Sequence, residues 1–328
     1  MRVTTADVFE AMQDDLERVE RRLVEAARID YPIVSTMVEN IVTTGGKRLR
    51  PLLLLLSARA FSYDQERAIT AAAGVELLHT ASLVHDDSID RAALRRGQPT
   101  LNTEFGSGAV ILIGDFLFAQ SAILAAATNN PRVVGIFAAA LGAICDGQLR
   151  ETLDAHRTDQ TRESYEQRIY GKTASLFAAA AEMGAVVGGA TEEQIATMKG
   201  FGGDIGMAFQ IVDDILDLRE GTQVLGKPAG NDLRQGVITL PTMLFAANPA
   251  VSDETRATMH AIVAGDETDD EVINALLTQI RASGAIEEAE RIAADYSASA
   301  RRRLTAIEDA SVRGHLEEIV DLTLIRSF

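Results

Sequence analysis

The chain has 328 residues, of which 47% are hydrophobic and 24% are charged, with 31 basic against 48 acidic side chains. This composition is typical of a globular protein with a large buried core and excludes a long disordered tail. The net charge of −17 excludes general nucleic-acid binding, because a phosphate backbone is bound by clustered cations. A single cysteine excludes a disulfide framework and a thiolate metal cluster, and it indicates a reducing compartment.

Apolar residues recur at helical spacing along almost the whole chain. The pattern predicts an outer amphipathic helix over 6–27 and a central helix that starts at Pro51. Further helices are predicted over 66–90, 108–127, 132–156, 162–184 and 192–220. The helices after Asp253 are more polar and are expected to form an outer layer. The chain is therefore predicted to be an all-α bundle of roughly a dozen helices, with one domain over residues 1–328.

The segment 107–128 is apolar and long enough to cross a membrane. Asp115 and Gln120 interrupt it, and such side chains are unfavourable in lipid. We therefore expect a buried core helix and no stable membrane insertion. The acidic, amphipathic N-terminus does not resemble a signal peptide, so a cytoplasmic location is expected.

Two acidic motifs with the same spacing lie in apolar helices, namely Asp86, Asp87 and Asp90, and Asp213, Asp214 and Asp217. The first and last aspartates of each motif are four residues apart and share one helix face. Such concentrated negative charge is repulsive unless cations lie beside it. Carboxylate oxygens are the ligands that Mg²⁺ prefers, so two facing motifs predict a site for several Mg²⁺ ions and a polyphosphate.

Basic residues gather in the Gly-rich loops at 43–50, 91–101 and 221–239. Lys47 and Arg50 lie where a helix begins, which favours anion binding. The other candidates that follow or accompany the acidic motifs are Arg95, Arg96, Lys172, Thr173, Lys227 and Asp232. His79 lies two turns before Asp86 on roughly the same face and is either a binding residue or a satisfied core histidine. His85 is expected to form a hydrogen bond within the helix end.

The segments GGKRLRP (45–51), LLHTASLVHDDSIDRAALRRGQPT (77–100), GKTASL (171–176), FQIVDDILD (209–217) and LGKPAGNDLRQGVITLP (225–241) resemble those of the trans-isoprenyl diphosphate synthases, the polyprenyl synthetase family. The resemblance covers nearly the whole chain. It implies an all-α homodimer in which each subunit has a deep central cavity. It also implies a Mg²⁺-dependent transferase that joins isopentenyl diphosphate to an allylic diphosphate.

The resemblance also implies roles for individual residues. Those implied to bind isopentenyl diphosphate are Lys47, Arg50, His79 and Arg96. Those implied to bind the allylic diphosphate are Arg95, Lys172, Thr173, Gln210 and Lys227. The implied ligands of about three Mg²⁺ ions are Asp86, Asp90 and Asp213, with indirect contributions from Asp87, Asp214 and Asp217.

One position departs from the family pattern. Many members carry a further Lys in the turn before TLP, and Val237 stands there in this chain. The difference predicts weaker binding of the allylic diphosphate rather than loss of activity. Two alternative functions stay open. One is a class I terpene cyclase, and the other is a non-catalytic or regulatory subunit of a heteromeric prenyl synthase.

Product length is predicted from the residues that precede the first acidic motif. Leu78, Ala81 and Ser82 lie about 6 to 12 Å back along the helix from Asp86. Shorter-chain members of the family often place an aromatic residue at one of the last two positions. Ala81 and Ser82 are too small to stop a growing chain, so the sequence predicts products of 20 carbons or more. An Ala81→Phe substitution is expected to shorten them.

Overall fold

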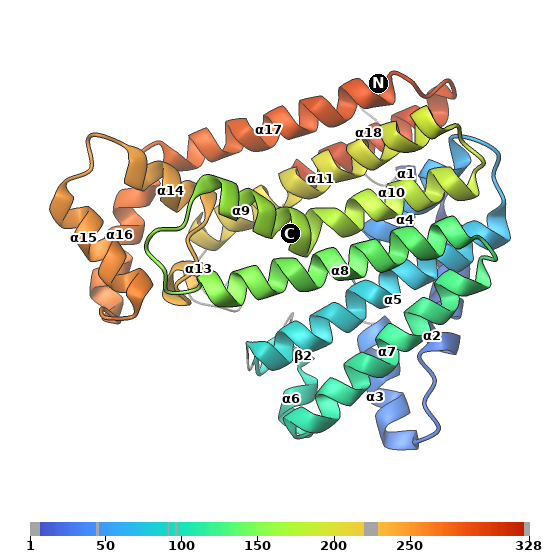
Figure 1. Ribbon diagram of the computed structural model, residues 1–328, viewed down its shortest axis with the longest axis horizontal. Helices are drawn as coiled ribbons and strands as arrows, with labels where there is room; N and C mark the ends of the chain where they lie inside the picture. The colour runs from blue at the N-terminus through green and yellow to red at the C-terminus, as the bar shows by residue number, and fades with distance from the viewer. Residues whose placement is uncertain (1–6, 44–45, 91, 96–97, 220–228, 325–328) are drawn as a thin grey trace. The chain divides into compact units, whose positions relative to one another are not determined.

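The computed structural model describes residues 7–43, 46–90, 92–95, 98–219 and 229–324. These residues are almost entirely helical, as the hydrophobic periodicity predicts (Figure 1). In the first half of the chain the elements are α1 (Asp7–Ala11), α2 (Gln13–Ala26), α3 (Pro32–Thr43), α4 (Leu49–Arg59), α5 (Gln65–Ile89), β1 (Leu94–Arg95), β2 (Gln98–Pro99), α6 (Leu101–Glu104), α7 (Ser107–Ala127) and α8 (Pro131–Asp154). In the second half they are α9 (Arg162–Ile169), the π-helical segment η1 (Tyr170–Ala174), α10 (Ser175–Val187), α11 (Glu192–Arg219), α13 (Asn231–Arg234), α14 (Leu240–Ala247), α15 (Asp253–Ala264), α16 (Asp270–Ala282), α17 (Ala285–Leu304) and α18 (Ala310–Leu324).

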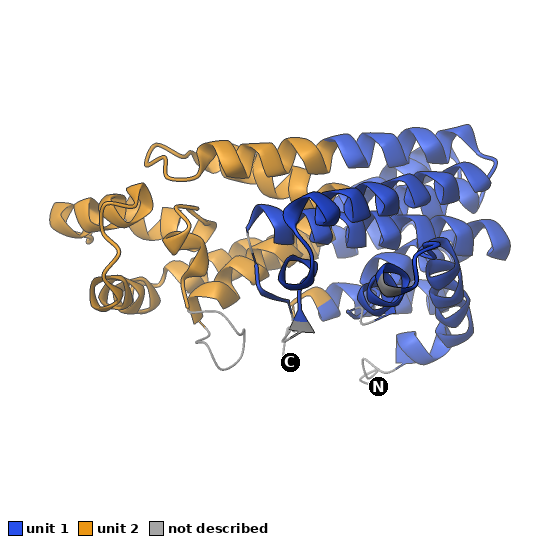
Figure 2. Cartoon of the chain, turned by 90° about the horizontal axis from the view of Figure 1, so that it is seen from below, with its two compact units in different colours: residues 1–142, 176–203, 300–322 blue, residues 143–175, 204–299, 323–328 orange. Residues whose placement is uncertain are grey.

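The chain divides into two compact units, which are described one at a time (Figure 2). Unit 1 comprises residues 1–142, 176–203 and 300–322, and unit 2 comprises residues 143–175, 204–299 and 323–328. The first acidic motif belongs to unit 1 and the second to unit 2. The sequence therefore places one motif in each unit.

Unit 1 is built around α4 and α5, whose side chains are buried nearly all round. Helix α4 begins at Leu49, two residues earlier than predicted, and carries Pro51 in its first turn. Proline is tolerated there because its missing N–H would have no intrahelical partner. Helix α5 packs along α7, where a Cβ atom at Gly74 would lie 3.4 Å from the Cβ atom of Leu124. The absence of a side chain at Gly74 thus allows the two helices to approach closely.

Helix α7 is buried along one face only, although the sequence predicts a buried core helix. Ile113 and Leu117 pack inside unit 1, whereas the side chains of Leu112 and Ile123 are 69% and 57% exposed. Helices α7 and α8 are both long and apolar enough to cross a membrane, by length and composition alone. Helix α7 thus carries exposed apolar side chains on the side that faces away from the core of unit 1.

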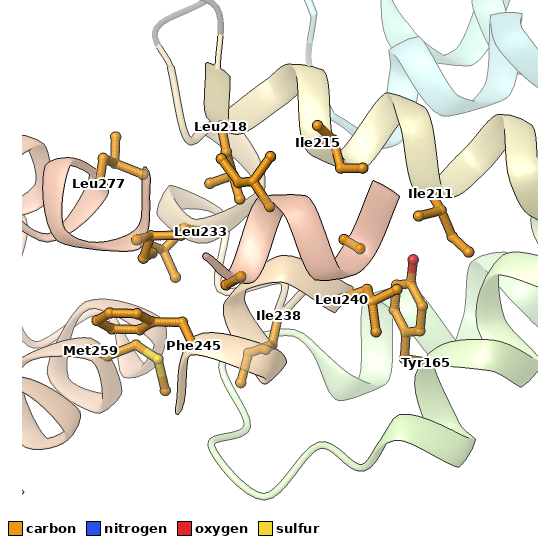
Figure 3. Packing of buried hydrophobic residues seen from close by; sticks show 14 of the residues in the cluster. Tyr165, Ile211, Ile215, Leu218, Leu233, Ile238, Leu240, Phe245, Met259 and Leu277 are labelled. Atoms are coloured by element: carbon orange, nitrogen blue, oxygen red, sulfur yellow. The ribbon is translucent and has the colours of Figure 1, made fainter. Parts of the chain in front are cut away.

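Unit 2 has its own apolar core, formed by α9, the second half of α11 and the helices that follow it (Figure 3). Helix α16 shows why its sequence folds this way. Its buried residues recur at helical spacing, at Ile273, Leu276, Leu277 and Ile280, while charged residues occupy the other face. Ser252 and Asp269 cap α15 and α16 by accepting hydrogen bonds from backbone N–H groups. The charge-laced sequence after Asp253 is thus confirmed as amphipathic helix.

Two predicted helices are interrupted. The helix predicted over 6–27 is broken at Met12, which separates α1 from α2. The helix predicted over 162–184 contains the π-helical turn η1 at the GKT sequence. Hydrophobic periodicity does not reveal such breaks, because the pattern of apolar residues continues across them.

Candidate active site

The first acidic motif lies at the C-terminal end of α5 in unit 1. Asp86 and Asp90 lie on the accessible face of the helix, whereas Asp87 is 8% exposed. The Asp87 carboxylate accepts hydrogen bonds from the Arg95 guanidinium, with Nε 2.8 and 2.9 Å from its two oxygens. The buried aspartate is therefore neutralised within the protein, while the two accessible aspartates share a face that is open to ligands.

The loop after the first motif is attached to the helix end by hydrogen bonds. Asn102 donates its side-chain N–H to the backbone oxygen of Asp87 at 2.6 Å, and Thr100 donates its hydroxyl to the oxygen of Ala92 at 2.5 Å. Arg95 lies in β1, which pairs with β2 in a two-residue antiparallel ladder. These contacts fix Arg95 beside Asp87. Arg96, the neighbouring predicted residue, lies outside the described residues.

The histidines of α5 differ in their environment. His79 lies on the accessible face that also carries Asp86, in agreement with its predicted position. The sequence predicts a hydrogen bond from His85 within its own helix end, but the side chain instead reaches α7. Its Nε2 atom lies 3.1 Å from the backbone oxygen of Ile111, and the ring packs edge-on against Phe118. His85 is thus a contact between α5 and α7.

Three basic residues at or just before the start of α4 have different environments. Lys47 is exposed and follows residues 44–45, which lie outside the described part of the chain. Arg48 has a φ angle of +49° and pairs with Glu20 and Glu76, so its guanidinium is held inside unit 1. Arg50 stacks over the Phe177 ring, with Cζ 4.3 Å from the ring centroid. The spacing alone could not separate Arg48, an internal ion-pair residue, from its two neighbours.

The second motif lies in α11, in the part of that helix that belongs to unit 2. Asp213 and Asp217 are partly accessible, and Asp214 is 3% exposed. Tyr165 donates its hydroxyl to Asp214 Oδ2 at 2.6 Å, and Gln210 donates its amide N–H to Oδ1 at 2.9 Å. The second aspartate of each motif is therefore buried against protein donors, whereas the first and last are at least partly accessible, although Asp217 also accepts hydrogen bonds from two backbone N–H groups.

Charge accumulates around the second motif. Burial raises the pKa of Asp214 to about 6, despite the lowering effect of its hydrogen bonds to Tyr165 and Gln210. Burial also raises the pKa of Asp232 well above its usual range, and the carboxylates of Asp217 and Asp214 raise it further. Three carboxyl groups thus gather where the positive charges of Arg168 and Lys172 only partly offset the cost of burial.

Lys172 and Thr173 lie in the π-helical segment η1. The Lys172 ammonium pairs with the Glu151 carboxylate on α8, and the Thr173 hydroxyl donates to Gln210 Oε1 at 2.6 Å. A Cβ atom at Gly147 would lie 2.3 Å from the Lys172 backbone nitrogen, so η1 and α8 touch through their backbones. A π-helical turn at this point agrees with a functional role, since such turns are frequent at functional sites.

The remaining predicted residues are Asp217, Lys227 and the three residues of α5 that are expected to control product length. Asp217 accepts hydrogen bonds from the backbone N–H groups of Asn231 and Asp232, at 3.1 and 3.2 Å. Lys227 lies outside the described residues. Leu78 and Ala81 are fully buried in unit 1, and Ser82 is partly accessible.

The carboxylates of the two acidic motifs are the candidate ligands for Mg²⁺. Within the described residues, no three His, Cys, Asp or Glu side chains are grouped closely enough to hold a metal ion. The chemistry nevertheless fits a hard divalent cation, because each motif presents two accessible carboxylates on one helix face. The residues present therefore fit Mg²⁺ whose coordination is completed by other oxygen ligands.

The sequence analysis did not identify several residues that contact the predicted site residues. Tyr165 and Glu151 each contact a predicted residue, and neither stands at a diagnostic spacing from it. Asn102 anchors the first motif from 15 residues away. A buried tyrosine in an otherwise polar helix is a weak signal, and the sequence contains no stronger one.

The class of protein follows from comparison with known proteins. The family model described as Polyprenyl synthetase matches residues 31–280. The chain belongs to the polyprenyl synthetase family, and it is an enzyme of the prenyltransferase class. The resemblance found in the sequence is thereby confirmed.

Individual relatives cover nearly the whole chain. Heptaprenyl diphosphate synthase component 2 from Geobacillus stearothermophilus is 38% identical over 95% of this chain and 96% of its own. Nonaprenyl diphosphate synthase from Mycobacterium tuberculosis is 36% identical over 96% of this chain and 93% of its own. A crystal structure of polyprenyl synthase from Caulobacter crescentus, complexed with calcium and isoprenyl diphosphate, superposes with a TM-score of 0.92 at 32% identity and covers 98% of both chains. These likenesses confirm the all-α isoprenoid synthase fold.

Proposed function

We propose that this chain catalyses the Mg²⁺-dependent head-to-tail (1′-4) condensation of isopentenyl diphosphate with an allylic diphosphate. The product is an all-trans polyprenyl diphosphate of 20 carbons or more. The observation that carries the proposal is the shared organisation of the two acidic motifs. In each, the first and last aspartates are accessible on one face, and the second is buried against protein donors. The prenyl diphosphate synthases among its relatives support the same reaction class.

Residues 1–328 are proposed to form a single polyprenyl synthetase domain. Mg²⁺, about three ions per active site, would supply positive charge that stabilises the allylic diphosphate as a leaving group. Asp86, Asp90 and Asp213 are proposed as the main ligands. Lys172 and Lys227 bind the same diphosphate, and Lys47 and Arg50 bind that of isopentenyl diphosphate. The isopentenyl double bond attacks the allylic cation, and the new chain loses a proton to the departing diphosphate.

One incubation tests the reaction. Purified protein is mixed with labelled isopentenyl diphosphate, an allylic primer and Mg²⁺, and the products are separated by chain length. Linear diphosphates of 20 or more carbons are expected, and their formation should stop when Mg²⁺ is chelated. A cyclic hydrocarbon would instead identify a class I terpene cyclase.

A second candidate function is favoured by one comparison. The relative from Geobacillus stearothermophilus is named component 2 of a heptaprenyl diphosphate synthase, which implies that this relative acts with another component. The chain would then be one subunit of a heteromeric synthase. Activity of the purified chain alone excludes an obligatory partner. Activity that appears only after a second component is added favours this alternative.

We further propose that the chain is a cytoplasmic homodimer, joined through the exposed face of α7. Leu112 and Ile123 are eleven residues apart, so they share one side of that helix. An apolar stripe of this kind favours a protein interface. Leu112→Lys and Ile123→Lys should each convert the dimer to a monomer in sedimentation or light-scattering measurements. A wild-type chain that is monomeric, or that needs detergent to stay in solution, would exclude the homodimer.

A further inference from the structure

The hydroxyl of Tyr165 is buried next to the second acidic motif. The residue is 1% exposed, and its ring packs in the apolar core of unit 2 (Figure 3). Figure 3 shows the hydroxyl oxygen directed toward the helix that carries Ile211, which is α11. There the oxygen lies 2.6 Å from Asp214 Oδ2. Packing alone requires only the ring, so the hydroxyl needs a separate explanation.

Tyr165 is one end of a chain of hydrogen bonds that reaches the π-helical turn. Gln210 donates to the other oxygen of Asp214 at 2.9 Å, and Thr173 donates to the amide oxygen of Gln210 at 2.6 Å. The directions of these bonds depend on one another. An ionised Asp214 only accepts, so Gln210 must turn its amide nitrogen toward it and its oxygen toward Thr173. The single hydroxyl proton of Thr173 is thus directed at Gln210.

Arg168 supports the Tyr165 end of this chain. Its guanidinium is 2% exposed and lies 5.5 Å from the centroid of the Tyr165 ring. Its Nη1 group donates to Gln160 Oε1 at 2.9 Å, and its Nη2 group donates to the backbone oxygen of Ile238 at 2.8 Å. A buried cation fixed in this way stabilises the negative charge of Asp214 without touching it.

We propose that Tyr165 is a positioning residue for the second acidic motif. Through Asp214 it fixes Asp213, the adjacent proposed Mg²⁺ ligand. Through Gln210 and Thr173 it fixes the π-helical turn that presents Lys172. Tyr165 touches neither substrate nor metal in this assignment, and it acts by holding residues that do. The expected loss of kcat rests on the proposed function. The expected loss of metal binding rests on the hydrogen bonds alone.

The test compares Tyr165→Phe with the matched control Tyr296→Phe. Tyr296 lies on α17 and packs against the same core of unit 2, so its substitution also removes one phenolic hydroxyl. Binding of Mn²⁺ in the presence of inorganic diphosphate is measured by electron paramagnetic resonance, without turnover. Residues that orient metal ligands typically change metal affinity or activity by about 10- to 100-fold. Tyr165→Phe should weaken Mn²⁺ binding and lower kcat by that factor, and it should leave the KM for isopentenyl diphosphate unchanged. Tyr296→Phe should change neither Mn²⁺ binding nor kcat.

A second pair of variants keeps the test decisive if Tyr165→Phe does not fold. Thr173→Val breaks the same chain at its other end, and Thr173→Ser retains the hydroxyl. Thr173→Val should also weaken Mn²⁺ binding, and Thr173→Ser should restore it. Where Tyr165→Phe folds, the double variant with Thr173→Val should weaken binding by less than the product of the two single effects. Any one of three results would overturn the proposal. These are wild-type Mn²⁺ affinity in Tyr165→Phe, independent effects in the double variant, and equal Mn²⁺ binding by the Val and Ser variants of Thr173. A wild-type protein that binds Mn²⁺ and diphosphate but makes no product would overturn the proposed function and leave the role of Tyr165 intact.

Discussion

Gly147 of α8 lies against the backbone nitrogen of Lys172, so closely that a Cβ atom at position 147 would come within 2.3 Å of it. Gly171, on the other side of this contact, would place its own Cβ atom 2.8 Å from the backbone oxygen of Ala143. Two glycines thus let α8 touch the π-helical turn η1. Since this turn carries Lys172 and Thr173, the contact sets where those side chains point.

Gly147→Ala should therefore displace the π-helical turn. Inserting a methyl group into a tightly packed contact destabilises a protein by about 1–3 kcal/mol. We expect a loss of this size in the free energy of unfolding, measured by denaturant titration, together with a higher KM for the allylic substrate. Gly142→Ala in the same helix is the control, because nothing lies within 4 Å of a Cβ atom there. It should stabilise the protein by about 0.4–1 kcal/mol, as such changes do at unstrained helical positions. Equal effects of the two substitutions would contradict the close contact.

Asp86→Ala and Asp213→Ala should each lower turnover by several orders of magnitude at saturating Mg²⁺. Each removes an accessible carboxylate from a proposed metal-binding face. The metal-free protein should be no less stable, because a repulsive charge is lost. Asp295→Ala, which removes an exposed carboxylate from α17, should leave turnover unchanged. Near-normal turnover in either motif variant would show that its carboxylate is not a metal ligand.

The cations are expected to divide between the two substrates. Lys47→Ala should raise KM for isopentenyl diphosphate, and Lys172→Ala should raise KM for the allylic diphosphate and lower kcat. A hydrogen bond to a charged group is worth about 1.5–3 kcal/mol, or roughly ten- to a hundredfold for each residue. Steady-state kinetics with one substrate varied at a time separates the effects. A change confined to the allylic KM in Lys47→Ala would mean that the two pockets are assigned the wrong way round.

Protein stability should depend on pH through Asp214. Its pKa is raised from 3.8 to about 6 in the folded chain, chiefly by burial. The folded protein therefore holds this proton more tightly than the unfolded chain does. The contribution of Asp214 to the free energy of unfolding should fall by about 3 kcal/mol as the pH rises from about 4 to about 6, and Asp232, whose pKa is also raised by burial, should lower stability further as the pH rises. Asp214→Asn should remove the Asp214 contribution to this slope in denaturant titrations of the metal-free protein, whereas Asp295→Asn should preserve it.

The sequence predicted the long helices and both acidic motifs because each depends on local spacing. Helical periodicity placed α5, α7 and α11 to within a residue or two, and the repeated DDxxD spacing marked the accessible aspartates. Tyr165 and Glu151 were missed because their contacts join separate helices of unit 2, and nothing in a single sequence reports such pairs. The exposed side of α7 was missed for a related reason. An apolar stripe looks the same whether it meets the core of its own chain or another surface.

Product length depends on which residues of α5 line the path of the growing chain. The accessible face of α5 carries Asp86 and Asp90 and continues back through Leu83 and Ser82 to His79. Ala81 lies on a different face. It is fully buried. Gly74, seven residues before it, and His85, four residues after it, both contact α7, so Ala81 lies on the face of α5 that is directed toward α7.

A prenyl chain that starts beside Asp86 should therefore meet Ser82 before it meets Ala81. Ser82→Phe is expected to shorten the products toward 15 carbons by blocking the accessible face, with little loss of stability. Ala81→Phe should also shorten them. Because its ring must first displace the packing between α5 and α7, it should lower the free energy of unfolding by about 1–3 kcal/mol as well. Product analysis by chain length, together with denaturant titration, distinguishes the two. Should both variants keep the wild-type products, the growing chain does not pass this part of α5, even if the assignment of the acidic motifs is correct.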